Sequence, residues 1–239
     1  GWTEVSLEPM TEDESISLIG DLLPVDSALT TDDKARMTQD AGGSPFVLEQ
    51  LARYAAVDGT RSHQAPTFAA MFDSRLGALS LEAHRFLETL AICGRPMAPE
   101  LICAASGVAR DRQSLVAMLR ASHFIRSSGS SERVETYHDR IREVLAAQIA
   151  PEAARRIHGL LVQALLEKRS DDCEALFEHY RGAGDHDHAS IQAGLAAEKA
   201  ADALAFDRAA FLYKQALALT PASPAAAAWK EGVADALAN

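Results

Sequence analysis

The chain has 239 residues, 48% of them apolar and 24% charged, which is enough to build two or three small folded units. Its formal net charge of −11 argues against charge-driven binding to nucleic acid or to an anionic membrane. Cys93, Cys103 and Cys173 are odd in number and far apart, so neither a disulfide framework nor a zinc cluster is predicted. No apolar run could span a bilayer and no signal peptide opens the sequence, so we expect a cytoplasmic protein.

The first residues predict a strand followed by a helix. Val5 and Leu7 alternate with polar residues, as at the end of a strand, and we therefore expect a sheet upstream. Thr11 is the expected N-cap of a helix with acidic residues in its first turn, and Pro24 is expected to end it. Its apolar face is predicted to hold Ile16, Leu18, Ile19, Leu22 and Leu23.

The next segment, DAGGSPFVLEQLARYAA, carries a strong helix start. Ser44 offers a capping hydroxyl, and Pro45 suits the first helical position, where its missing N–H costs nothing. Gly42 and Gly43 before it let the backbone turn or approach another group closely. A further helix is predicted from the apolar stripe Phe68, Met71, Phe72, Leu76 and Leu79.

Residues 81–150 are predicted to form a winged-helix domain. Three amphipathic helices are followed by two β-prone runs, Phe124–Ile125 and Val134–Tyr137, with a Ser/Gly turn between them. The second run leads straight into a helix at His138 and Asp139. Three helices, a two-stranded wing and a helix are the order of elements in a winged helix.

Residues 151–239 are rich in alanine and helical in pattern throughout. Ala209, Tyr213, Ala216 and Pro221 are spaced like the second helix of a tetratricopeptide repeat, and Ala197 is a small residue on the first helix. We therefore expect Ala197, Ala209 and Ala216 in helix–helix contacts and Tyr213 between helices. The last residues are expected to open a further, truncated repeat.

The ordered motifs LEPMTEDE, GGSPFVLEQLAR, PTF with RLGAL, YHDRIRE and HYRGAGD resemble those of STAND ATPases, the signal-transduction ATPases with numerous domains. The similarity is to bacterial members fused to Ser/Thr kinases, adenylate cyclases or transcription regulators, and it covers nearly the whole chain. Each motif is weak alone, and their order along the chain makes the resemblance specific.

The resemblance implies a regulatory role beside an upstream nucleotide-binding domain. In this family a helical lid and a winged helix fold over ADP in the off state. Gly43, Ser44 and Pro45 match the Gly-x-Pro motif of the lid, which packs near the nucleotide base; many relatives have Asn where Ser44 stands. His138 matches a histidine that contacts the β-phosphate, and Asp139 follows it. A helix start favours phosphate through its N–H groups, and an imidazole adds a directional donor.

Three other readings of these residues are open. His138 and Asp139 could simply begin a helix. The run Asp185–His188 with His179 could gather around a divalent ion, although a solvated loop between helices is the expected alternative. DNA binding is suggested by four arginines near the third helix of the winged helix, Arg110, Arg112, Arg120 and Arg126, but nearby acidic residues dilute their charge.

The sequence therefore predicts a mostly α protein with a helical lid segment (1–80), a winged helix (81–150) and tetratricopeptide-like repeats (151–239). We expect the regulatory and protein-interaction segment of a STAND-type ATPase, with the upstream nucleotide domain and a partner or inducer of the repeats as its contacts. No P-loop or other catalytic motif is present, so we expect no enzyme activity and no metal or cofactor in this chain; ADP or ATP belongs to the parent. The alternative is a winged-helix DNA-binding transcription regulator with a helical effector domain.

Overall fold

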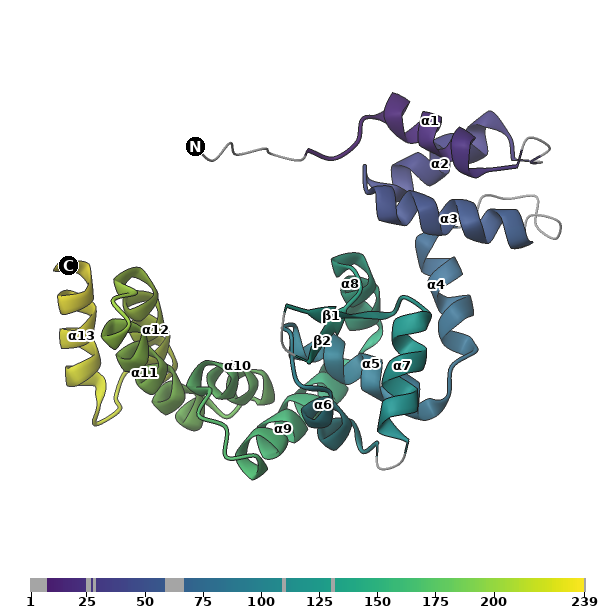
Figure 1. Ribbon diagram of the computed structural model, residues 1–239. Helices are drawn as coiled ribbons and strands as arrows, with labels where there is room; N and C mark the ends of the chain where they lie inside the picture. The colour runs from purple at the N-terminus through teal and green to yellow at the C-terminus, as the bar shows by residue number, and fades with distance from the viewer. Residues whose placement is uncertain are drawn as a thin grey trace. The chain divides into compact units, whose positions relative to one another are not determined.

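The computed structural model describes residues 8–24, 27, 29–58, 67–108, 111–129 and 132–238. They are mostly helical, with one small antiparallel sheet of two strands (Figure 1). The chain divides into two compact units, Gly1–Leu79 and Ser80–Asn239, and each is treated by itself. The strand predicted at Val5 and Leu7 lies outside the described residues. Within the described ranges, no helix is both long and apolar enough to cross a membrane.

The described helices of the N-terminal unit are α1 (Glu12–Leu22), α2 (Thr31–Ala41), α3 (Pro45–Asp58) and α4 (Phe68–Gly77). The predicted start of α1 is confirmed, because Thr11 and Glu14 form a reciprocal capping box that satisfies backbone N–H groups at the helix end. Its predicted apolar face is partly wrong. Ile19 and Leu23 are buried, whereas Ile16 is 36% exposed and lies at the edge of the face.

Helix α2 was not predicted. Its residues are mainly polar, and Met37 and Ala41 are its buried apolar side chains, too few to give a clear helical period. The signal that identifies it is the capping box of Thr30 and Asp33, in which the Asp33 carboxylate accepts from the Thr30 N–H at 2.9 Å. Helix α4 buries Phe68, Met71, Phe72 and Leu76, as the stripe predicted, while Leu79 follows the helix.

The first part of the C-terminal unit contains three helices, a hairpin and a helix in the predicted order. The elements are α5 (Leu81–Cys93), α6 (Pro99–Ser106), α7 (Arg112–Ala121), β1 (Ile125–Ser128), β2 (Arg133–Thr136) and α8 (Asp139–Gln148). The strands pair antiparallel, with Ile125 opposite Thr136 and Ser128 opposite Arg133. Met97, between α5 and α6, adds an isolated antiparallel bridge to Val134, with N···O distances of 3.0 and 2.8 Å. The hairpin is therefore tied to the connection that follows α5.

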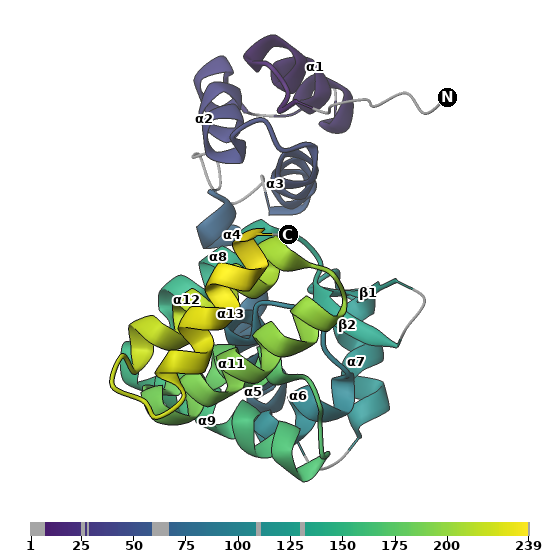
Figure 2. The same ribbon diagram turned by 90° about the vertical axis from the view of Figure 1, so that its left-hand side faces the viewer.

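The rest of this unit is helical, as predicted, and consists of α9 (Pro151–Glu167), α10 (Cys173–Ala183), α11 (His186–Asp202), α12 (Phe206–Leu219) and α13 (Ala226–Ala238). Each of these helices packs against the next, and Figure 2 shows α11, α12 and α13 side by side. Helix α9 also contacts α5 and α6. The hairpin-bearing part (α5–α8 with β1 and β2) and the helical array (α9–α13) therefore share one compact unit.

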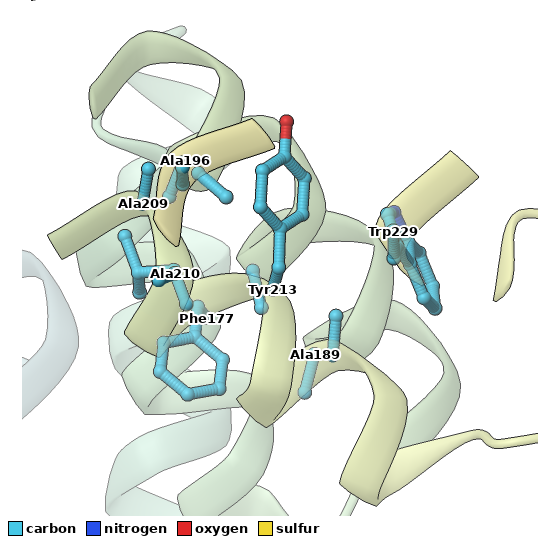
Figure 3. Packing of buried hydrophobic residues seen from close by; sticks show 12 residues of the cluster. Phe177, Ala189, Ala196, Ala209, Ala210, Tyr213 and Trp229 are labelled. Atoms are coloured by element: carbon cyan, nitrogen blue, oxygen red, sulfur yellow. The ribbon is translucent and has the colours of Figure 1, made fainter. Parts of the chain in front are cut away.

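Small residues bring the helices of the array close together. Ala197, Ala209 and Ala216 are fully buried and Tyr213 is 8% exposed, all in one hydrophobic cluster, which confirms the predicted burial. Figure 3 shows alanines of α11 and α12 in this cluster together with the rings of Phe177, Tyr213 and Trp229. Close approach depends on glycine at two points: a Cβ atom on Gly194 would overlap the indole of Trp229, and one on Gly232 would lie 2.5 Å from the ring of Tyr213.

Candidate functional site

The Gly43–Pro45 segment forms a tight turn between α2 and α3. Gly42 and Gly43 both have positive φ, 54° and 76°, a conformation that strongly favours glycine. The carbonyl of Gly43 accepts from the Met10 N–H at 2.9 Å, and a Cβ on Gly43 would lie 2.7 Å from the Met10 carbonyl oxygen. Gly43 is therefore fixed against the segment before α1, where any side chain would force the backbone apart.

Ser44 and Pro45 begin α3 at the predicted residue, but the predicted hydroxyl cap is wrong. The carbonyl of Ser44 accepts the first helical bond from Leu48 at 3.1 Å, and its N–H donates to Ala41 at 3.0 Å. The Ser44 Oγ atom is buried and has no hydrogen-bond partner. The backbone of this residue starts the helix, and Pro45, at the first helical position, is exposed.

His138 is the N-cap of α8, directly after β2. Its backbone is extended (φ −149°, ψ 149°) and its Nδ1 atom accepts from the Arg140 N–H at 3.1 Å. In the neutral ring an accepting Nδ1 places the proton on Nε2, so this contact selects the tautomer that donates from Nε2. The ring is half-buried, and Asp139 is the first, exposed residue of the helix. The cap and a donating imidazole are thus compatible in one side chain.

The predicted site residues lie in different units. Gly43, Ser44 and Pro45 belong to the N-terminal unit and His138 to the C-terminal unit, so the structure describes each group in its own unit.

The arginines considered for DNA binding are partly engaged in local contacts. Arg110 lies outside the described residues. Arg112 donates from Nε to the Val108 carbonyl at 3.3 Å, and Arg126 forms an ion pair with Glu135 across the hairpin at 2.9 Å. Arg112 and Arg120 line a hollow beside α6 and α7, but Glu100 and Glu132 line it too. The local field of this surface is therefore mixed in sign.

The run Asp185–His188 is a helix start, and its prediction as a loop is wrong. Asp185 caps α11 by accepting from the His188 N–H at 3.2 Å, and its carboxylate also contacts His188 Nδ1 at 2.8 Å. His186, Asp187 and His188 are exposed in the first turn of α11, as a solvated segment should be. Considering only the residues that the structure describes, no group of three or more His, Cys, Asp or Glu side chains could hold a metal ion.

His179, which was considered above as a metal ligand together with Asp185–His188, instead contacts His158. The contact lies between α9 and α10, the first two helices of the array. The two Nδ1 atoms are 3.2 Å apart. His179 is 1% exposed and its Nε2 has no hydrogen-bond partner, while His158 is half-buried. Burial, together with the neighbouring His158 and Arg95, lowers the pKa of His179 to about 4; burial and Arg181 also lower the pKa of His158. Both rings are neutral at neutral pH.

The pair borders a hollow of about 540 Å³ between the end of α5 and helices α9 and α10. Its walls include Cys93 and Arg95 from the α5 end and three carboxylates from the region of α10, Asp172, Glu174 and Glu178. Burial raises the pKa of the Cys93 thiol to about 11, which leaves it protonated and unreactive. The sequence did not predict this pair, because its members lie 21 residues apart on separate helices.

No protein-family model matches the chain, and no curated protein matches its sequence.

Proposed function

We propose that this chain is the regulatory and interaction segment of a STAND-type signalling ATPase. In this proposal the N-terminal unit belongs to the helical lid, residues 81–150 form a winged helix, and α9–α13 begin a tetratricopeptide-like array that senses a protein partner or inducer. The lid and the winged helix hold an upstream nucleotide-binding domain in its ADP-bound off state. The chain itself performs no catalysis, and it acts in the cytoplasm.

The observation that carries the proposal is the imidazole of His138 at the N-terminus of α8. The helix start supplies backbone N–H groups and the positive end of the helix dipole, and the imidazole that caps it through Nδ1 belongs to the same helix end. An imidazole held at this helix end can hydrogen-bond the β-phosphate of ADP where that phosphate lies against the helix start. A charge-assisted hydrogen bond to phosphate contributes ~1.5–3 kcal/mol, which would shift a lid equilibrium about tenfold or more.

The Gly43–Pro45 turn supports a lid contact near the nucleotide base. Gly43 is fixed against Met10, and Pro45 is exposed at the start of α3. A rigid turn with an exposed proline offers an apolar contact with little loss of conformational entropy. Ser44 takes part in the turn through its backbone alone. The presence of Ser here, where many relatives have Asn, therefore leaves the backbone role of this residue intact.

The spacing of the array helices supports the tetratricopeptide-like assignment. Helices α9 and α11 begin at Pro151 and His186, 35 residues apart, and α10 and α12 begin at Cys173 and Phe206, 33 residues apart. These offsets bracket the 34 residues of a tetratricopeptide repeat. The bridge between Met97 and Val134 and the hairpin before α8 support the winged-helix assignment.

The test is the rate of ADP release from the full-length parent, which we propose has an upstream P-loop domain. His138→Ser keeps a side chain that caps α8 but is too short to replace an imidazole at a phosphate. We expect it to speed ADP release about tenfold or more and to raise basal signalling. His186→Ala, on the exposed first turn of α11, is the control and should change neither. Equal rates of ADP release from the full-length wild-type protein and its His138→Ser variant would refute the proposal. A gene without an upstream P-loop would refute it too.

The second candidate, a winged-helix DNA-binding regulator, is favoured by Arg112 and Arg120 on α7. The mixed charge of that surface and the overall charge of −11 oppose it. A mobility-shift assay with duplex DNA distinguishes the two. Binding that weakens steeply with salt and is lost in Arg120→Ala would support the DNA-binding candidate.

A further inference from the structure

We propose that His158 and His179 form a two-histidine binding site for a divalent transition-metal ion of the zinc type. The two Nδ1 atoms lie 3.2 Å apart at the hollow between α5, α9 and α10. Two nitrogen ligands that are each roughly 2.0–2.1 Å from a tetrahedral zinc ion are about 3.3 Å apart. The imidazoles therefore already have the separation that chelation requires. This inference does not depend on the assignment to a STAND-type ATPase.

Packing alone does not require histidine at these two positions. His158 is the eighth residue of α9 and His179 the seventh of α10, and the matching positions of α11 and α12 are Ala193 and Leu212. Both of these are fully buried and apolar. The second helix pair thus fills the equivalent interior without polar groups. Burying two imidazoles in the first pair is costly, particularly because Nε2 of His179 has no hydrogen-bond partner.

Gly182 shows that the His158 ring has a place built for it. This glycine is the next-to-last residue of α10, and a Cβ atom there would overlap the His158 imidazole. Here the missing side chain lets the ring lie against the backbone of α10.

The two imidazole ligands favour a cation of borderline softness over a hard cation. Asp172, Glu174 and Glu178 also line the hollow, and each is paired with an arginine, namely Arg95, Arg208 and Arg181 in that order. In the hydrogen-bonded pair one Nδ1 carries the proton that it donates to the other, so a metal ion bound by both Nδ1 atoms requires this proton to move to Nε2 of the same ring. Imidazole nitrogen suits Zn²⁺, Ni²⁺ and Cu²⁺, whereas Mg²⁺ prefers oxygen. The chain supplies two ligands, fewer than the three or four of structural and catalytic zinc sites, so water completes the coordination.

The position of the site suggests what the ion does. His158 lies on α9, which also contacts α5 and α6, and His179 lies on α10. A metal ion held by both would link these two helices beside the connection that follows α5. It would thereby stiffen the junction between the hairpin-bearing part and the helical array.

The test is equilibrium dialysis of the 239-residue chain, without a histidine tag, against Zn²⁺ at neutral pH. The matched variant is His158→Ala with His179→Leu, which copies the residues of the second helix pair and should fold. A second variant, His158→Asn, retains a polar group at the edge of the hollow. The control is His186→Ala with His188→Ala, which removes the two exposed histidines of α11.

We expect roughly one Zn²⁺ per chain in the unmodified 239-residue chain and in the control. Binding should be at least tenfold weaker in both site variants. Zn²⁺ should also raise the melting temperature of the unmodified chain and leave that of His158→Ala with His179→Leu unchanged. Three results would overturn the proposal: no Zn²⁺ binding by the unmodified chain, equal binding by folded site variants, or displacement of Zn²⁺ by equimolar Mg²⁺. Any of these would leave the pair as two neutral rings joined by a hydrogen bond.

Discussion

The guanidinium of Arg95 lies 2.6 Å from the carboxylate of Asp172. Arg95 follows α5, and Asp172 caps α10 by accepting from the Ala175 N–H at 2.9 Å. One carboxylate therefore begins a helix of the array and also binds the connection that leads to Met97 and the hairpin. This double role makes Asp172 the polar link between the two parts of the C-terminal unit.

Replacing Asp172 should separate these two roles. Asp172→Asn retains an oxygen for the cap and weakens the ion pair, whose partners are about one-third exposed; we expect a loss of roughly 0.2–1 kcal/mol. Asp172→Ala removes both contacts and should cost about 1–2 kcal/mol, including the cap. Urea unfolding of the three proteins at neutral pH measures the difference. Equal stability of the Asn and Ala variants would show that the cap contributes nothing.

The Asp172 contribution should depend on pH. Burial alone would raise the pKa of this carboxyl, but the Ala175 N–H and Arg95 outweigh it and hold the pKa below the ordinary value of 3.8. A depressed pKa means that the stabilisation is present above the unfolded-state value and is lost as the pH falls below it. The stability gap between the wild-type chain and Asp172→Asn should therefore shrink as the pH falls from neutral to below 3.8. A gap that stays constant over this range would contradict the assignment.

Two glycine substitutions in the array should have opposite signs. Gly194→Ala places a methyl group against the indole of Trp229 at a buried contact, so we expect a loss of roughly 1–3 kcal/mol from overpacking. A Cβ on Gly159, in α9, meets no atom within 4 Å, so Gly159→Ala should stabilise by about 0.5–1 kcal/mol through helix propensity. Thermal melts of both variants test the close approach of α11 and α13. A neutral Gly194→Ala would count against it.

A charge scan of α12 should follow its buried face. Ala209 is fully buried in the hydrophobic cluster, whereas Ala218 on the same helix is exposed. Ala209→Glu should destabilise by a few kcal/mol, because it adds volume and a charge with no ion partner in an apolar interior. Ala218→Glu, the control, should change stability by no more than ~0.5 kcal/mol. An unchanged melting temperature in Ala209→Glu would contradict the proposed tetratricopeptide-like packing.

The elements that the sequence predicts well are those with local signals. Thr11 and Pro24 bound a helix through capping and proline chemistry, and the two short β-prone runs form the expected hairpin before His138. These effects act between residues a few positions apart, so they are legible in one sequence. Helix α2 was missed because its helical signal is the Thr30–Asp33 box rather than a hydrophobic period.

The site features that the sequence missed depend on packing between helices. The orientation of the Ser44 hydroxyl is set by its surroundings, so a good capping residue type did not guarantee a cap. His158 and His179 meet because α9 packs on α10, which no spacing along one helix reveals. Gly182 was the available sign, since a glycine inside a helical pattern indicates a close neighbour.

Substitutions of His138 should separate its cap from its imidazole in the isolated chain. His138→Ala leaves the Arg140 N–H without the Nδ1 acceptor that now lies at 3.1 Å, and we expect a loss of about 0.5–2 kcal/mol. His138→Ser restores an oxygen acceptor at a position where serine is among the best caps, so its stability should match or exceed that of the parent. Urea unfolding midpoints of the three proteins provide the comparison.

This calibration decides how the nucleotide experiment on the proposed full-length ATPase is interpreted. If His138→Ser is as stable as the wild-type chain and still accelerates ADP release, the effect belongs to the lost imidazole donor and not to a frayed α8. If only His138→Ala accelerates release while His138→Ser behaves as the wild type, the histidine acts as a helix cap and the phosphate contact is refuted. The distinction is measurable because the serine oxygen can still accept a hydrogen bond from the Arg140 N–H.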